Sequence, residues 1–98
     1  MQIIDNDKKL KVIQCSYEEM SLATGNPLPV CDNCIEDCEN GYYVAVINRW
    51  LCESCYQEFM EYAKRYEEDC EVENRNFDTY LGLLKKAETI IKLKGENK

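Results

Sequence analysis

Short runs rich in apolar residues lie on both sides of polar, turn-forming residues in two parts of the chain, a pattern typical of β-hairpins. In the first, Ile3-Ile4 and the alternating residues 10–13 flank the polar, turn-rich stretch 5–9, which predicts an N-terminal hairpin. In residues 42–52, aromatic and β-branched residues lie on both sides of Asn48 and Arg49. This second pattern predicts another hairpin.

A short helix is predicted after the first hairpin. Residues 16–19 match a capping box, in which the Ser16 hydroxyl and the Glu19 carboxylate each accept a hydrogen bond from the other residue's backbone N–H. Gly25 is expected to end this helix. Because a proline disfavours helical backbone in the residue before it, residues 26–29, with their two prolines, are expected to be an extended connector.

Apolar residues recur every three or four positions in the second half of the chain, which predicts two amphipathic helices. The first should have Cys55 in its first turn and carry an apolar stripe made of Tyr56, Phe59, Ala63, Tyr66 and Cys70. It should end in the polar stretch 71–74. The second should run from Asn76 to Gly95, with an apolar face made of Phe77, Tyr80, Leu84, Ala87 and Ile91.

The apolar face of this C-terminal helix is wider than a small domain needs, because four more apolar residues flank it: Leu81, Leu83, Ile90 and Leu93. Two interpretations follow. In the first, the helix packs against the helix before it. In the second, it forms part of the surface of a homodimer or of a complex with a partner protein.

A chain of 98 residues is expected to form a single domain, residues 1–98. Its predicted parts are an N-terminal hairpin with a short helix (1–29), a metal module (30–73) and the C-terminal helix (74–98). No apolar stretch approaches the length of a membrane span, and the first residues do not have the pattern of a secretory signal. We therefore expect a cytoplasmic protein with no membrane partner.

The net charge of −7 is concentrated in the middle of the chain. Residues 31–73 contain twelve acidic and three basic residues, whereas residues 85–98 carry a net charge of +3. Nucleic-acid affinity comes largely from basic groups that displace counterions, so this distribution disfavours direct nucleic-acid binding. It leaves open an acidic mimic or antagonist that occupies the basic groove of a nucleic-acid-binding protein.

Two Cys-x-x-Cys pairs, Cys31/Cys34 and Cys52/Cys55, are separated by 17 residues. Each pair can bring two sulfur atoms to one metal ion, and together they indicate a four-thiolate site for one structural Zn²⁺ per chain. Four thiolates also suit iron. Disulfides or unliganded thiols are the alternatives to a metal site.

The chain has three further cysteines, which bring the total to seven. Cys38 is close enough in sequence to the first pair to be an alternative ligand. Cys15 follows an apolar strand and Cys70 continues a helical stripe, so both are expected to be buried like small apolar side chains.

The chain is predicted to have a Cys-x-x-Cys turn, then a hairpin, then a second Cys-x-x-Cys turn that enters a helix. This order of elements resembles that of a treble-clef zinc finger. The stretch from Trp50 to Phe59 looks like the closing half of a LIM-type finger. The resemblance covers residues 31–66, and its cysteine spacing is more specific than its other residues.

The resemblance implies a role for each of the four cysteines. Cys31 and Cys34 would be the ligands of a metal knuckle, Cys52 the ligand at a strand end, and Cys55 the ligand at a helix start. The free N–H groups and the dipole of that helix start should lower the pKa of the Cys55 thiol.

We therefore expect an α+β protein with a small zinc-stapled, treble-clef-like core of metal knuckle, hairpin and helix. The chain has no histidine, and four cysteine ligands leave no open coordination position for hydrolysis. A non-enzymatic protein–protein interaction module is the function that these features favour. Its contact surfaces would be an acidic helix face, the C-terminal helix, and three tyrosines that could instead pack over the hairpin: Tyr42, Tyr43 and Tyr62.

Overall fold

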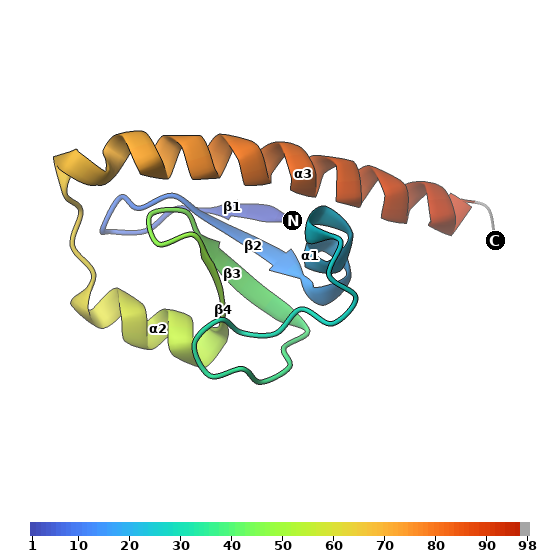
Figure 1. Ribbon diagram of the computed structural model, residues 1–98, viewed down its shortest axis with the longest axis horizontal. Coiled ribbons are helices and arrows are strands. Elements are labelled where there is room, and N and C mark those ends of the chain that lie inside the picture. Colours follow the sequence, from blue (N-terminus) through green and yellow to red (C-terminus); the bar gives the residue numbers. More distant parts are fainter. Residues whose placement is uncertain (97–98) are drawn as a thin grey trace.

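The computed structural model describes residues 1–96 and has the expected α+β fold (Figure 1). A four-stranded antiparallel sheet, in the order β1-β2-β3-β4, has α1 and α3 on one face and α2 on the other. In chain order the elements are β1 (Gln2–Ile4), β2 (Val12–Ser16), α1 (Tyr17–Thr24), β3 (Asn40–Val44), β4 (Arg49–Cys52), α2 (Glu53–Tyr62), a 3₁₀ turn (Glu67–Asp69) and α3 (Cys70–Glu96).

Both predicted hairpins are present, and they join into one sheet because β2 pairs with β3 along its whole length. The second hairpin turns earlier than the sequence pattern suggests. Strand β3 ends at Val44, and the chain turns back at Asn48, whose N–H donates to the Ala45 carbonyl at 3.1 Å. Asn48 has a φ of 53°, a left-handed conformation that asparagine tolerates better than most residues.

Successive residues of a strand point to opposite faces, so the sheet has two separate cores. The face under α1 and α3 buries Ile13, Cys15, Met20, Tyr43, Ala45, Trp50 and Leu84. The face toward α2 buries Leu10, Val12, Cys31, Val44, Leu51, Cys55 and Ala63. The metal-site cysteines that are buried therefore belong to only one of these cores.

The predicted capping box opens α1. The Ser16 hydroxyl accepts a hydrogen bond from the Glu19 N–H at 3.1 Å, and the Glu19 carboxylate accepts one from the Ser16 N–H at 2.9 Å. Gly25 ends the helix with a left-handed φ of 73°, as expected. The other carboxylate oxygen of Glu19 accepts a hydrogen bond from the N-terminal ammonium group of Met1 at 2.7 Å.

The predicted boundary between the last two helices was wrong. Helix α2 ends at Tyr62 rather than near residue 70, and α3 begins at Cys70 rather than at Asn76. Ala63 has extended backbone and is buried in the α2 core, which turns the chain away from the helix axis. Residues 71–74 are helical, and within them Glu73 is only 1% exposed and accepts a hydrogen bond from the Lys11 N–H at 3.1 Å.

Helix α3 packs on α1 and β2 through its predicted apolar face, rather than on α2, the preceding helix against which the first interpretation placed it. Leu84 and Ala87 are buried, and the Tyr80 ring stacks on Tyr43 with a centroid distance of 4.0 Å. Asn76 also ties the helix to the sheet, since its amide donates to the Ala45 carbonyl at 2.9 Å. The C-terminal end of α3 extends past α1, away from the rest of the fold (Figure 1).

Candidate metal centre

Four cysteines from three parts of the fold meet at one end of the sheet. Cys31 and Cys34 lie on the loop between α1 and β3, Cys52 ends β4, and Cys55 lies in the first turn of α2. Their Sγ atoms all lie within 4.8 Å of one another. These are the four cysteines singled out by their spacing in the sequence, and together they could hold a metal ion.

The distances between these sulfur atoms fit a tetrahedral metal site. With Zn–S bonds of about 2.3 Å, the edge of a regular tetrahedron is about 3.8 Å. The Sγ atoms of Cys34, on the loop before β3, and of Cys52, at the end of β4, are 3.8 Å apart. A metal ion could therefore be bound with small side-chain adjustments.

Backbone hydrogen bonds shape the loop that carries the first two cysteines. The Ile35 N–H donates to the Cys31 carbonyl at 2.9 Å, and the Cys31 N–H donates to the Glu36 carbonyl at 3.1 Å. Ile35 has a φ of 63°, a left-handed conformation that is costly for a β-branched residue. The tight turn is thus built with strain at Ile35, whose side chain is 74% exposed.

Asp32 fastens this loop to the edge of the sheet. Its carboxylate accepts a hydrogen bond from the Trp50 N–H at 2.8 Å, and its own N–H donates to the Trp50 carbonyl at 2.9 Å. Strand β4 is the last strand of the sheet, so these two bonds occupy polar groups that an edge strand otherwise leaves unpaired. Sequence reasoning missed this role, because nothing local marks Asp32 as the partner of a strand 18 residues away.

Hydrogen bonds prepare one of the four thiols for ionisation. Burial by itself raises the pKa of Cys31, but hydrogen bonds from the backbone of Cys34, Cys52 and Asn33 outweigh it and lower the pKa to about 6. A thiolate is the form of cysteine that binds a metal ion. Cys31 is also completely buried, which places this negative charge inside the fold.

The neighbouring thiols behave in the opposite way. A hydrogen bond from the Glu36 backbone lowers the pKa of Cys34, but burial and the sulfur atoms of the other three cysteines raise it to about 12.

The prediction that the helix start lowers the pKa of the Cys55 thiol was wrong. The Asn33 amide donates to its Sγ at 3.3 Å and lowers its pKa, yet burial and the thiols of Cys52 and Cys31 give a net increase. The raised pKa values keep these thiols protonated, and all four sulfurs could be thiolates together only with a cation between them.

The remaining cysteines lie outside this cluster. Cys38 is half-buried against the core under α1 and α3, and burial raises its pKa to about 11. Cys15 is buried there as predicted. Cys70 is only half-buried, contrary to expectation, and its Sγ accepts a hydrogen bond from the Arg65 guanidinium at 3.2 Å.

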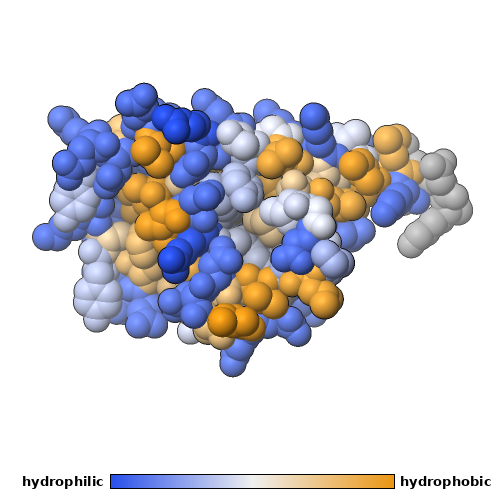
Figure 2. All heavy atoms as spheres, viewed as in Figure 1, coloured by the Kyte–Doolittle hydropathy of each residue, from blue (hydrophilic) through white to orange (hydrophobic). Residues whose placement is uncertain are grey.

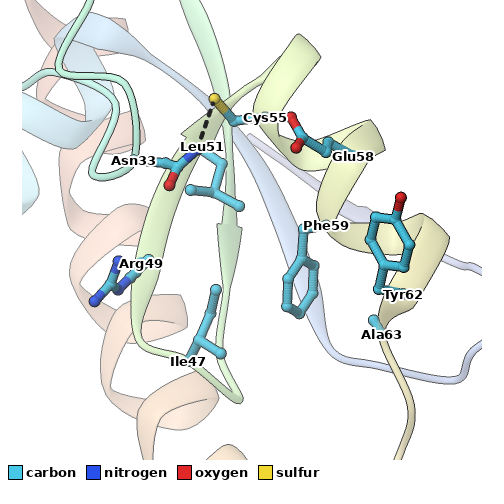
Figure 3. Close-up of a pocket in the computed structure, with 9 residues that line it drawn as sticks. All are labelled: Asn33, Ile47, Arg49, Leu51, Cys55, Glu58, Phe59, Tyr62 and Ala63. Carbon is cyan, nitrogen blue, oxygen red and sulfur yellow. Dashed lines mark hydrogen bonds between the residues drawn. The ribbon is translucent and has the colours of Figure 1, made fainter.

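A groove of about 590 Å³ lies beside the cysteine cluster, between α2 and the second hairpin (Figure 3). Its floor and walls are mainly apolar, with Leu51 and Ile47 on the hairpin side and Phe59 and Tyr62 on the helix side. Asn33 and Cys55 form the end nearest the sulfur atoms. The groove is therefore continuous with the candidate metal centre.

Comparison with family models, with curated proteins and with solved structures finds no match to this chain. No related protein therefore shows which type of metal site the four cysteines form. In the part of the chain that the structure describes, no helix is both long and apolar enough to span a membrane.

Proposed function

We propose that this chain is a non-enzymatic zinc protein in which one structural Zn²⁺ bound by Cys31, Cys34, Cys52 and Cys55 holds together a protein–protein interaction module. The proposal rests chiefly on one observation: four Sγ atoms from three elements lie within 4.8 Å of one another. A site filled by four thiolates is closed to substrate, and metal sites of this kind are usually structural. We also propose that residues 31–66 contain a treble-clef-like unit of knuckle, hairpin and helix, the helix being α2 (Glu53–Tyr62).

Zinc content and metal removal test the structural site. We expect about one Zn²⁺ per chain by elemental analysis, and loss of structure around α2 when a strong chelator removes it. Cys34→Ser should lower the zinc content sharply. Cys38→Ser is the matched control and should retain the metal, because Cys38 lies outside the cluster. A folded, metal-free wild-type protein would refute the proposal, and iron in place of zinc would correct it.

Exposed aromatic side chains near the groove support a role in protein binding. Tyr62 is 77% exposed and Tyr66 is 52% exposed, and tyrosine is enriched at protein interfaces. The other two tyrosines considered from the sequence are engaged within the fold. Tyr43 is buried, and Tyr42 stacks on Tyr56 with a centroid distance of 4.2 Å.

Capture of a cellular partner by the zinc-loaded protein tests the interaction role. Tyr62→Ser should reduce capture at least tenfold if the partner uses the groove. Tyr17→Ser on α1, away from the groove, is the control; because Tyr17 is half-buried and its hydroxyl donates to the Pro27 carbonyl at 3.0 Å, thermal unfolding of both variants separates loss of binding from loss of fold. Equal capture by both variants would exclude the groove as the partner's binding surface.

The acidic mimic remains the weaker candidate. Glu73 is buried and bonded within the fold, so it offers no charge to a partner. Two groups of acidic residues lie in separate parts of the molecule (Figure 1). One is in residues 36–39, after the Cys31/Cys34 turn, and the other is in the 3₁₀ turn, residues 67–69. Charge reversal at residues 67–69 distinguishes the two functions, because only a mimic should lose its partner.

A cytoplasmic location is part of the same proposal. It is supported by the proposed zinc site, since four cysteines can hold a metal ion only where they stay reduced, and disulfides are rare in reducing compartments. Expression of the tagged protein followed by cell fractionation tests it. Recovery with oxidised cysteines from an oxidising compartment would refute it.

A further inference from the structure

The apolar groove beside the metal centre is open to solvent although its lining is largely hydrophobic. Leu51 and Ala63 form its buried part, whereas Tyr62 on its rim is 77% exposed. Figure 2 shows apolar groups interrupting the polar surface of the molecule in several places. An apolar groove walled by a helix is the kind of surface that receives an amphipathic helix from a partner.

The helix that walls this groove carries only negative charge. Among its ten residues α2 has three glutamates, Glu53, Glu58 and Glu61, and no lysine or arginine. Glu58 lines the groove, and Glu61 lies one turn further along the same helix surface. Both are exposed and form no ion pair within residues 1–96. Arg49 is the only basic residue that lines the groove, and its side chain points away from α2 (Figure 3).

The complementary chemistry lies at the other end of the molecule. The projecting end of α3, residues 85–95, has four exposed lysines and a single acid, Glu88, which pairs with the N-terminal ammonium group at 2.9 Å. Ile90 and Leu93 on the same segment are 42% and 53% exposed. Ala87 is buried against the fold, but Ile90 and Leu93 are not covered, so the last turns of this segment form a basic amphipathic helix with exposed apolar side chains.

We propose that the groove between α2 and the second hairpin binds the basic end of α3 from a second copy of this chain. The two surfaces lie at opposite ends of a molecule 45 Å long, so they cannot meet within one copy. Opposite charges guide the approach, and burial of Ile90 and Leu93 in the groove stabilises the contact. The contact is head-to-tail, and it extends the proposed function without depending on an external partner.

Two charge-reversal variants test this contact. The tail variant, Lys92→Glu/Lys94→Glu, keeps an intact groove, and the groove variant, Glu58→Lys/Glu61→Lys, keeps an intact tail. Light scattering should give the wild type a mass above the 11.5 kDa of one chain, rising with concentration and falling with added salt. Each variant alone should self-associate at least tenfold more weakly.

An equimolar mixture of the two variants gives the decisive result. The intact groove of one should bind the intact tail of the other, so the mixture should form a complex of two chains that does not grow further. Glu18→Lys/Asp78→Lys changes exposed acids in neither surface and should associate like the wild type. Zinc content measured in every sample separates failure of this contact from failure of the metal site.

Three results would overturn the proposal. They are a monomeric wild type at all concentrations, a mixture that stays monomeric, and a groove variant that associates like the wild type while the tail variant does not. The last would indicate contact between two α3 helices. Binding of a monomeric wild type to anionic lipid vesicles, lost in the tail variant, would assign the tail to a membrane surface instead.

Discussion

The two faces of the sheet are stabilised in different ways. Under α1 and α3 the core consists of large apolar side chains, such as Trp50, Leu84 and Tyr43, which stacks on Tyr80. Under α2 the core combines aliphatic side chains, such as Leu10 and Leu51, with two buried thiols, Cys31 and Cys55. The first face can be held by apolar burial alone, whereas the second needs the metal ion that we propose.

Metal removal should produce the largest effect and separate the two faces. Zinc binding contributes on the order of 10 kcal/mol in small zinc modules, so chelation should unfold the loop of residues 31–36 and detach α2 from the sheet. Hydrogen exchange should accelerate in residues 31–36 and 53–62. It should stay slow in residues 12–16 and 77–87. If the whole chain exchanges as one unit, the faces are not energetically distinct.

Truncation of Leu84 should be the largest single-residue loss on the α3 face. Leu84 is fully buried, so Leu84→Ala should lower the free energy of unfolding by about 2–5 kcal/mol. The metal content should not change, because Leu84 is far from the sulfur atoms in the fold. Leu93→Ala, at an exposed position, should change stability by less than about 0.5 kcal/mol.

Gly41 tests how tightly the Trp50 ring packs on the sheet. A Cβ atom at Gly41 would overlap the Trp50 indole ring, so Gly41→Ala should destabilise by about 1–3 kcal/mol, measured by urea denaturation. Gly82→Ala is the matched control in α3. Nothing lies within 4 Å of a Cβ there, and alanine should stabilise the helix by about 0.5–1 kcal/mol. Equal effects at both glycines would contradict the close packing.

Relief of strain at Ile35 should give the smallest effect, and it concerns the metal face. Ile35→Gly removes a left-handed β-branched residue and should raise stability by about 0.5–1 kcal/mol after the entropy cost of glycine is subtracted. Zinc-dependent thermal unfolding measures it. Ile3→Gly, at an exposed strand position, should instead destabilise. A loss at both positions would mean that Ile35 is not strained.

Much of the fold and of the candidate site could be predicted where the causes are local. The capping box at Ser16, the end of α1 at Gly25 and the two hairpins each depend on a few neighbouring residues. The Cys-x-x-Cys spacing likewise identified the four cysteines that the fold brings together. What the spacing could not identify was Asp32, which bonds to a strand distant in sequence.

Tertiary contacts decided the rest, because they join residues that no local pattern relates. Helix α3 begins at Cys70, and its first turns are joined to the rest of the fold by a buried hydrogen bond from the Lys11 N–H to the Glu73 carboxylate, 62 residues away. The same helix packs on α1 and leaves its basic end projecting. The amino-acid sequence by itself therefore determined the elements and the four-thiol cluster. Only the fold decided which surfaces remain open, since exposure depends on how all the elements pack.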